Sequence, residues 1–225
     1  MGYLSKILNL VWKDLVIEFR AKEILSVMLI FAILVPIILA FSLNSAQETT
    51  ENIFPGIIWV ALTFSGILGF NRTFLNEKQN DSLLGLMLTP VDRTAIYFAK
   101  VIVNFTMMIF TEAVTLPLLF ILFDFRFRGS ILTLVLVIFL GTLGFTSVST
   151  FLSALSANTR ASEILLPIIL FPIIIPVIIA AVQSTGIVLV GASIGEIASW
   201  IKLLGVYDVI FMAVPFILFE YILEV

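Results

Sequence analysis

This chain of 225 residues is 61% hydrophobic and 12% charged, whereas soluble domains carry about 25% charged residues, so it has too few charged side chains to fold in water. It contains no cysteine and no histidine, which excludes disulfides, the usual zinc sites and the commonest general base and leaves only six Met and four Tyr as axial ligands for haem. The net charge of −3 gives no support to nucleic-acid binding, and the composition predicts an all-α integral membrane protein.

Residues 1–23 are predicted to form an amphipathic helix. Its apolar residues recur at steps of three and one, namely Leu4, Ile7, Leu8, Val11, Trp12, Leu15, Val16 and Phe19. The other face carries Lys6, Asn9, Lys13, Asp14 and Glu18. Such a helix lies in the membrane interface, with Trp12 at the lipid headgroups and Phe19 and Arg20 just before the first span. It either anchors the chain or packs as an elbow beside a partner subunit.

Six apolar runs of about 20 residues follow, and each is long enough to cross a hydrocarbon core of about 30 Å. They are 24–43, 53–70, 101–123, 131–155, 164–182 and 206–223, and together they make residues 1–225 a single transmembrane domain. With a cytoplasmic N-terminus, three of the 12 Lys and Arg residues fall outside (Arg126, Arg128 and Lys202) and the other nine fall inside. Both termini are therefore expected on the cytoplasmic side of the inner membrane.

The polar segment 72–93 is predicted to lie in the cytoplasm. Asp81 or Ser82 can cap a short helix there, and Pro90 ends it. The body of this helix is apolar, with Leu83, Leu84, Leu86, Met87 and Leu88. Leucines at a cytoplasmic surface need cover, either from the bilayer interface or from the groove of a soluble partner, and we favour the partner.

Glu112 stands near the middle of the third run, where an ionisable group is costly unless it is paired, protonated or hydrated. Two interpretations stay open. Glu112 either belongs to a substrate or proton path, or it bonds a neighbouring helix, for which the fourth run offers Thr142, Thr146 and Thr150.

The last part of the chain is predicted to contain a kinked span and a short surface helix. Pro167, Pro172 and Pro176 each remove an intrahelical hydrogen bond from the fifth run. The stretch 186–203 is too interrupted to cross the membrane, so we expect it to form a short helix on the outer face.

No sequence pattern for catalysis is present. The chain lacks a Gly-x-x-x-x-Gly-Lys-Ser/Thr loop for nucleotide phosphates, and it shows neither a triad-like arrangement nor a metal-ligand cluster. We therefore predict no catalytic residue and no bound metal. If ATP drives this protein, we expect another chain to hydrolyse it.

The second run opens with Pro55-Gly56-Ile57-Ile58-Trp59-Val60-Ala61, and this segment resembles the signature of the CcmB, or haem exporter protein B, family of the cytochrome c maturation system. Further segments follow in the order of the family: Phe19-Arg20, Ser82-Leu83, Leu86-Met87-Leu88 with Pro90, Ala99-Lys100, Thr142-Leu143-Gly144-Phe145 and the proline-rich stretch 165–181. The resemblance covers nearly the whole chain, and Pro55, Gly56 and Trp59 belong to its most specific part.

The resemblance implies a fold like that of ABC-2 type exporters and a permease subunit without a cofactor of its own. It implies two copies of this chain beside a CcmA-like ATPase, which binds ATP and Mg²⁺, with CcmC-like and CcmD-like membrane subunits and a CcmE-like haem chaperone. Haem is then handled by the complex. The segment from Asp81 to Pro90 matches the position of the coupling helix that docks on the ATPase, with Ser82, Leu83, Leu86, Met87 and Leu88.

A rival hypothesis makes the chain a stand-alone secondary carrier that uses Glu112 as a proton site. Inverted internal repeats would favour this hypothesis, and none is recognisable in the sequence. Arg126 and Arg128 on the outer side either anchor the outer interface or meet haem propionates or a periplasmic partner.

Overall fold

The computed structural model describes residues 2–42, 47–79, 91–157, 162–192 and 194–222. Within these ranges the chain forms seven helices and no strand: α1 Tyr3–Ala21, α2 Glu23–Ser42, α3 Gln47–Gln79, α5 Arg93–Leu122, α6 Ile131–Ala157, α7 Ser162–Leu189 and α8 Ile194–Ile222. Six of them contain a segment long and apolar enough to cross a membrane: Glu23–Ser42, Glu51–Phe70, Arg93–Leu122, Ile131–Ser156, Pro167–Leu189 and Gly195–Leu218. The prediction of an all-α membrane protein with six spans is confirmed.

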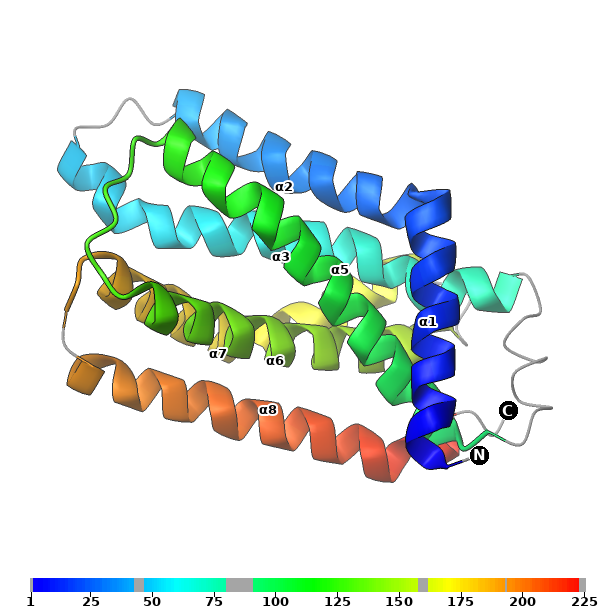
Figure 1. Ribbon diagram of the computed structural model, residues 1–225. Coiled ribbons are helices and arrows are strands. Elements are labelled where there is room, and N and C mark those ends of the chain that lie inside the picture. The colour runs from blue at the N-terminus through cyan, green and yellow to red at the C-terminus, as the bar shows by residue number, and fades with distance from the viewer. Residues whose placement is uncertain (1, 43–46, 80–90, 158–161, 193, 223–225) are drawn as a thin grey trace.

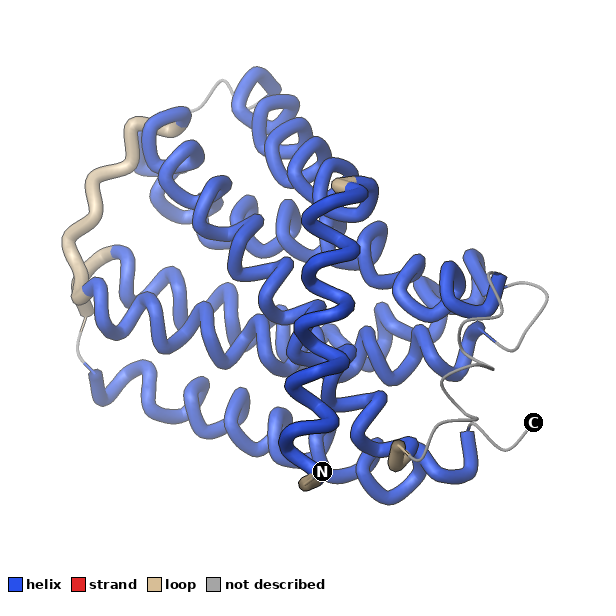
Figure 2. The backbone as a smooth tube through the Cα atoms, turned by 45° about the vertical axis from the view of Figure 1, so that its right-hand side comes forward, coloured by secondary structure: helices blue, strands red, loops and turns tan. Residues whose placement is uncertain are grey.

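The six long helices lie roughly side by side, and α1 crosses the bundle at one end (Figure 1). The beginning of α5 and the last turns of α8 lie at the same end, which we call the α1 end. The connection 123–130 between α5 and α6 lies at the opposite end. Figure 2, turned by 45°, shows that the chain changes direction sharply between α1 and α2. The bend occurs at Lys22, whose backbone is left-handed with φ of 59°.

The spans are held together mainly by close contact, since lipid chains are as apolar as leucine and give helices little reason to bury hydrophobic side chains against each other. α6 shows how small residues provide this contact. A Cβ atom added at Gly141 would lie 2.3 Å from the Trp59 ring of α3, and one added at Gly144 would lie 2.5 Å from Asp208 Oδ1 of α8. Glycine at these two positions therefore sets how closely α3 and α8 approach α6.

The prediction of a separate short helix over 186–203 is wrong. α7 continues to Leu189, a turn at Gly191 with φ of +79° reverses the chain, and α8 begins at Ile194 and runs without interruption. The apolar spacing that suggested a surface helix belongs to the first turns of α8, where Ile197 is buried with Val137 and Val188. The last span therefore begins about three turns earlier than predicted. α7 also runs through its three prolines as one helix.

The segment 72–93 also differs from its expected outline. α3 extends to Gln79, and α5 begins at Arg93 and runs straight into the third span. This span therefore starts earlier than the predicted 101–123, since Thr94, Tyr97 and Lys100 are already buried in the bundle. The residues predicted to couple to an ATPase lie outside the described residues: Asp81, Ser82, Leu83, Leu86, Met87, Leu88 and Pro90.

Candidate functional site

The α1 end of the bundle is built by α1 lying along the first half of α5. An apolar cluster joins the two helices, with Ile7 and Val11 of α1 packed on Ala95, Ala99 and Val103 of α5. The small side chains of the two alanines let α1 approach closely. α1 is adjacent to α2 in sequence, yet its apolar cluster is shared with α5.

The surface of α1 divides into three strips. Ile7 and Val11 face α5, whereas Leu4, Leu8 and Trp12 are exposed, with 72% of Trp12 accessible. Lys13 and Arg20 lie on a third, polar side, as the helical repeat of 3.6 residues requires. A helix with one protein-facing, one apolar exposed and one basic strip suits a membrane interface.

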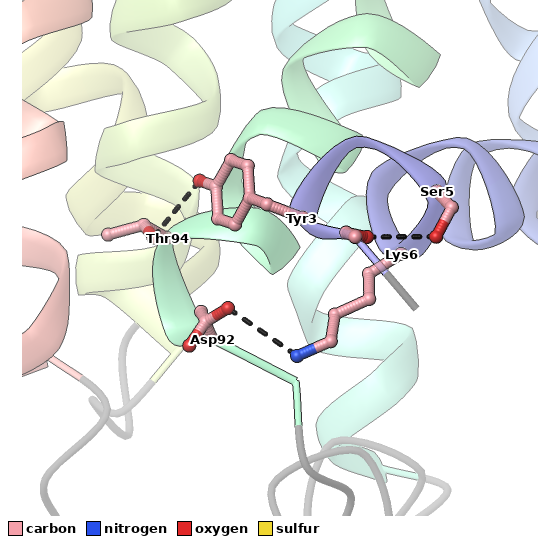
Figure 3. A network of polar contacts seen from close by, with 6 residues as sticks. Tyr3, Ser5, Lys6, Asp92 and Thr94 are labelled. Carbon is pink, nitrogen blue, oxygen red and sulfur yellow. Dashed lines mark hydrogen bonds and ion pairs between the residues drawn. The ribbon is translucent and has the colours of Figure 1, made fainter.

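A polar network fastens the beginning of α1 to the beginning of α5 (Figure 3). The Tyr3 hydroxyl donates to Thr94 Oγ1 at 3.1 Å, and Lys6 Nζ lies 3.6 Å from Asp92 Oδ2. Ser5 Oγ donates to the carbonyl of Gly2 at 2.8 Å, which holds the first turn of α1 in place. These contacts sit directly after the segment 80–90, so α1 is tied to the point at which the chain enters α5.

Farther along α1, Asp14 forms a buried ion pair with Lys100 of α5. Lys100 Nζ lies 2.7 Å from Asp14 Oδ2, and the two side chains are 7% and 8% exposed. Lys13, 42% exposed, approaches Asp14 Oδ1 at 3.1 Å. The sequence pattern puts Asp14 on the polar face of the amphipathic helix, whereas in the structure it is buried against α5. The predicted third span begins at residue 101, so the sequence pattern leaves Lys100 among the charges of the cytoplasmic loop before it.

Two of the predicted interfacial residues lie at the end of α1. Phe19 is exposed, and its ring contacts Phe110 of α5 edge to face with centroids 5.7 Å apart. Arg20 is also exposed, in the last turn of α1. Phe19 therefore extends the contact with α5, which now runs from Tyr3 to the end of the helix.

Glu112 is buried between α5 and α6 and accepts a hydrogen bond from the Thr142 hydroxyl. Thr142 is one of the three partners proposed from the sequence. Thr146 instead donates to its own helix, and Thr150 accepts from Asn104 Nδ2 at 2.8 Å. The second oxygen of Glu112, Oε2, has no hydrogen-bond partner among the described residues.

The segment that carries the sequence resemblance has a packing role in this structure. Pro55 and Trp59 are buried and Gly56 is half-buried. Trp59 Nε1 donates to Thr185 Oγ1 of α7 at 2.9 Å, while its ring rests on Gly141 of α6. Trp59 therefore joins three helices through one side chain.

Asp208 of α8 is a buried acid that the sequence reasoning missed. It is packed against Gly144, and neither carboxyl oxygen has a hydrogen-bond partner among the described residues. The predicted last span, 206–223, puts Asp208 at its edge. In the structure α8 runs from Ile194 to Ile222, so Asp208 lies in the middle of the helix. Thr142 and Gly144 are two residues apart and face opposite sides of α6, so Asp208 and Glu112 do not share a site.

The end opposite α1 is closed by the connection 123–130. Phe125 stacks on Phe54 of α3 with ring centroids 4.4 Å apart, while Arg126 and Arg128 are exposed. Arg128 pairs with Glu51 of α3 at 3.3 Å. In the described part of the chain, no three His, Cys, Asp or Glu side chains gather where they could hold a metal ion.

Comparison with known proteins gives a consistent result. The family model described as CcmB protein matches residues 5–221. Heme exporter protein B of Haemophilus influenzae is 29% identical over 176 residues, which make up 77% of this chain and 78% of that protein. Heme exporter protein B of Escherichia coli (strain K12) is 33% identical over 91 residues, which make up 40% of this chain and 41% of that protein. This match therefore spans less than half the length of the relative. That of Rhodobacter capsulatus is 24% identical over 167 residues, 74% of this chain and 76% of the relative.

Proposed function

The chain belongs to the CcmB family, and we propose that it is the permease subunit of a haem exporter-like complex in cytochrome c biogenesis. A separate CcmA-like subunit hydrolyses ATP with Mg²⁺. This chain transmits that hydrolysis to haem delivery or to the release of a haem-loaded, CcmE-like chaperone. CcmC-like and CcmD-like membrane subunits and a second copy of the chain complete the assembly.

The observation that carries this proposal is the position of the α1–α5 junction. The segment 80–90, which holds the leucines expected to dock on the ATPase, joins α5 at the point where Tyr3 and Lys6 fasten α1. A force applied to this segment therefore reaches α5 and α1 together. The chain has no phosphate-binding loop, so it requires a partner to supply that force.

The charge distribution supports a cytoplasmic α1 end in the inner membrane. Lys6, Lys13, Arg20 and Lys22 belong to α1 or its bend, and Lys100 pairs with α1. Among the described residues, the basic residues toward the other end are Arg126 and Arg128 of the connection 123–130 and Lys202 near the beginning of α8. An excess of basic residues on one side is the ordinary mark of the cytoplasmic side.

Haem is cargo of the complex in this proposal and is not held by the chain itself. The sequence contains no histidine or cysteine to serve as an axial ligand. We assign haem ligation to the CcmC-like and CcmE-like partners and the mechanical step to this chain.

The proposal is tested by purifying the tagged chain in detergent from its native membrane and assaying the recovered partners for ATPase activity. Leu86→Asp is expected to abolish recovery of the ATPase subunit, because a charge replaces an apolar docking contact. Asn80→Asp adds the same charge in the same segment without removing a leucine, and it should leave recovery unchanged. Full recovery with Leu86→Asp would contradict the docking role.

A stand-alone carrier is the alternative, and buried Glu112 with its unpartnered Oε2 favours it. The carrier hypothesis predicts transport by the purified chain in vesicles under a proton gradient, without nucleotide, and loss of transport in Glu112→Gln. Recovery of the folded chain without any ATPase subunit would favour this alternative.

A further inference from the structure

We propose that Asp14 and Lys100 are positioning residues that make α1 and the first half of α5 a single rigid lever. This inference rests on the proposed function, because the lever matters only if the segment 80–90 is moved by a partner. The chain then transmits motion through α5 and α1 together, and the ion pair keeps the two helices in register.

The bend at Lys22 explains why α1 needs such a device. Lys22 is left-handed, and its N–H donates to the carbonyl of Glu18 at 2.8 Å, so α1 is capped there and does not continue into α2. The bend is a hinge of about one residue, so a small rotation of the backbone at Lys22 would point α1 in another direction. The direction of α1 must therefore come from its lateral contacts.

Those contacts run along α5 in the same order as the chain. Tyr3 meets Thr94, Asp14 meets Lys100 and Phe19 meets Phe110. Residues that advance along α1 thus meet residues that advance along α5, which makes the two helices run in the same general direction. A displacement of the beginning of α5 therefore carries α1 with it.

The ion pair is the contact that best defines the register. Apolar side chains such as Ile7 and Val11 tolerate a slide along a surface of alanine and valine, because dispersion contacts have little directional preference. A buried carboxylate and ammonium 2.7 Å apart do not, since any slide leaves two dehydrated charges apart. Buried polar pairs are best attested as devices that select one register.

The experiment uses the complete complex and the absence of native cysteines. Cysteines introduced at Leu8 and Ile102, both exposed on their helices, carry nitroxide labels whose separation is measured by dipolar EPR. The Leu8–Ile102 distance distribution is expected to be narrow and unchanged by ATP. Asp14→Asn should broaden it, and Lys202→Gln, at the other end of the bundle, should not.

A function readout accompanies the distance. Asp14→Asn should retain recovery of the ATPase subunit but lose the dependence of ATP hydrolysis on the haem-loaded chaperone. The charge-reversed double variant, Asp14→Lys with Lys100→Asp, is built on Lys13→Gln, because Lys13 lies 3.1 Å from Asp14 and would repel a lysine there. It should restore both the narrow distribution and that dependence, which a variant that merely fails to fold would not do.

The outcomes separate the two proposals. If the wild-type chain recovers no ATPase subunit, the proposed function fails whatever the EPR result. If the subunit is recovered and Asp14→Asn leaves both the distance distribution and the coupling unchanged, the lever is refuted. Failure of the double variant to restore either property would also refute the register role.

Discussion

Removing the charge of Asp14 should destabilise the fold far more than removing the charge of Lys13. Asp14→Asn takes the carboxylate away from a buried ammonium, which costs about 3–5 kcal/mol when one member of a buried pair is lost. Lys100→Gln should cost about 2–3 kcal/mol, at or below the low end of that range, because Lys13 still lies 3.1 Å from Asp14. Lys13→Gln removes an ion pair with a substantially exposed partner and should cost about 0–1 kcal/mol.

The assay is unfolding of the purified chain by SDS in mixed micelles, followed by circular dichroism. The order of the three variants carries the test, since it depends on burial alone and not on the absolute scale. Equal losses for Lys13→Gln and Asp14→Asn would refute the reasoning, because they would mean that the Asp14–Lys100 pair is no better shielded than a surface pair.

Three further substitutions test the packing of the spans by the same unfolding assay. Thr185→Val removes only the hydrogen bond from Trp59 and should cost about 0.6–1.7 kcal/mol. Trp59→Phe removes the same bond and also withdraws the outer ring atoms that rest on Gly141, so it should cost more, and an equal loss would mean that the ring contact contributes nothing. Gly144→Ala places a methyl group against the Asp208 carboxyl and should cost about 1–3 kcal/mol, and a neutral result would mean that α8 moves away freely.

The number of spans could be predicted from the sequence because it depends on a long apolar run, which tertiary contacts do not disguise. Helix ends depend on those contacts. The sequence places Lys100 before a span because a charge breaks an apolar run, whereas in the structure Asp14 neutralises it within α5. Likewise Gly205 and Lys202 suggest a break, yet α8 continues through both.

The candidate site was only partly predictable for the same reason. The amphipathic repeat of residues 1–23 predicts a helix with an apolar stripe, but it gives no sign that Ile7 faces protein while Leu8 stays exposed. That division is set by α5, which is about 90 residues away in sequence. The sequence does not indicate that Asp208 is buried, because its depth in the membrane depends on where α8 begins.

The most direct test of an ATPase-coupled membrane subunit is cysteine cross-linking in native membranes, since the chain has no cysteine of its own. Cysteine at Leu86 should cross-link to an ATPase subunit, and cysteine at Leu132, exposed at the opposite end of the bundle, should not. This result would place the partner on the segment 80–90, which precedes α5 in the chain. Cross-linking from Leu132 alone, or from neither position while the chain remains folded and active, would contradict the account.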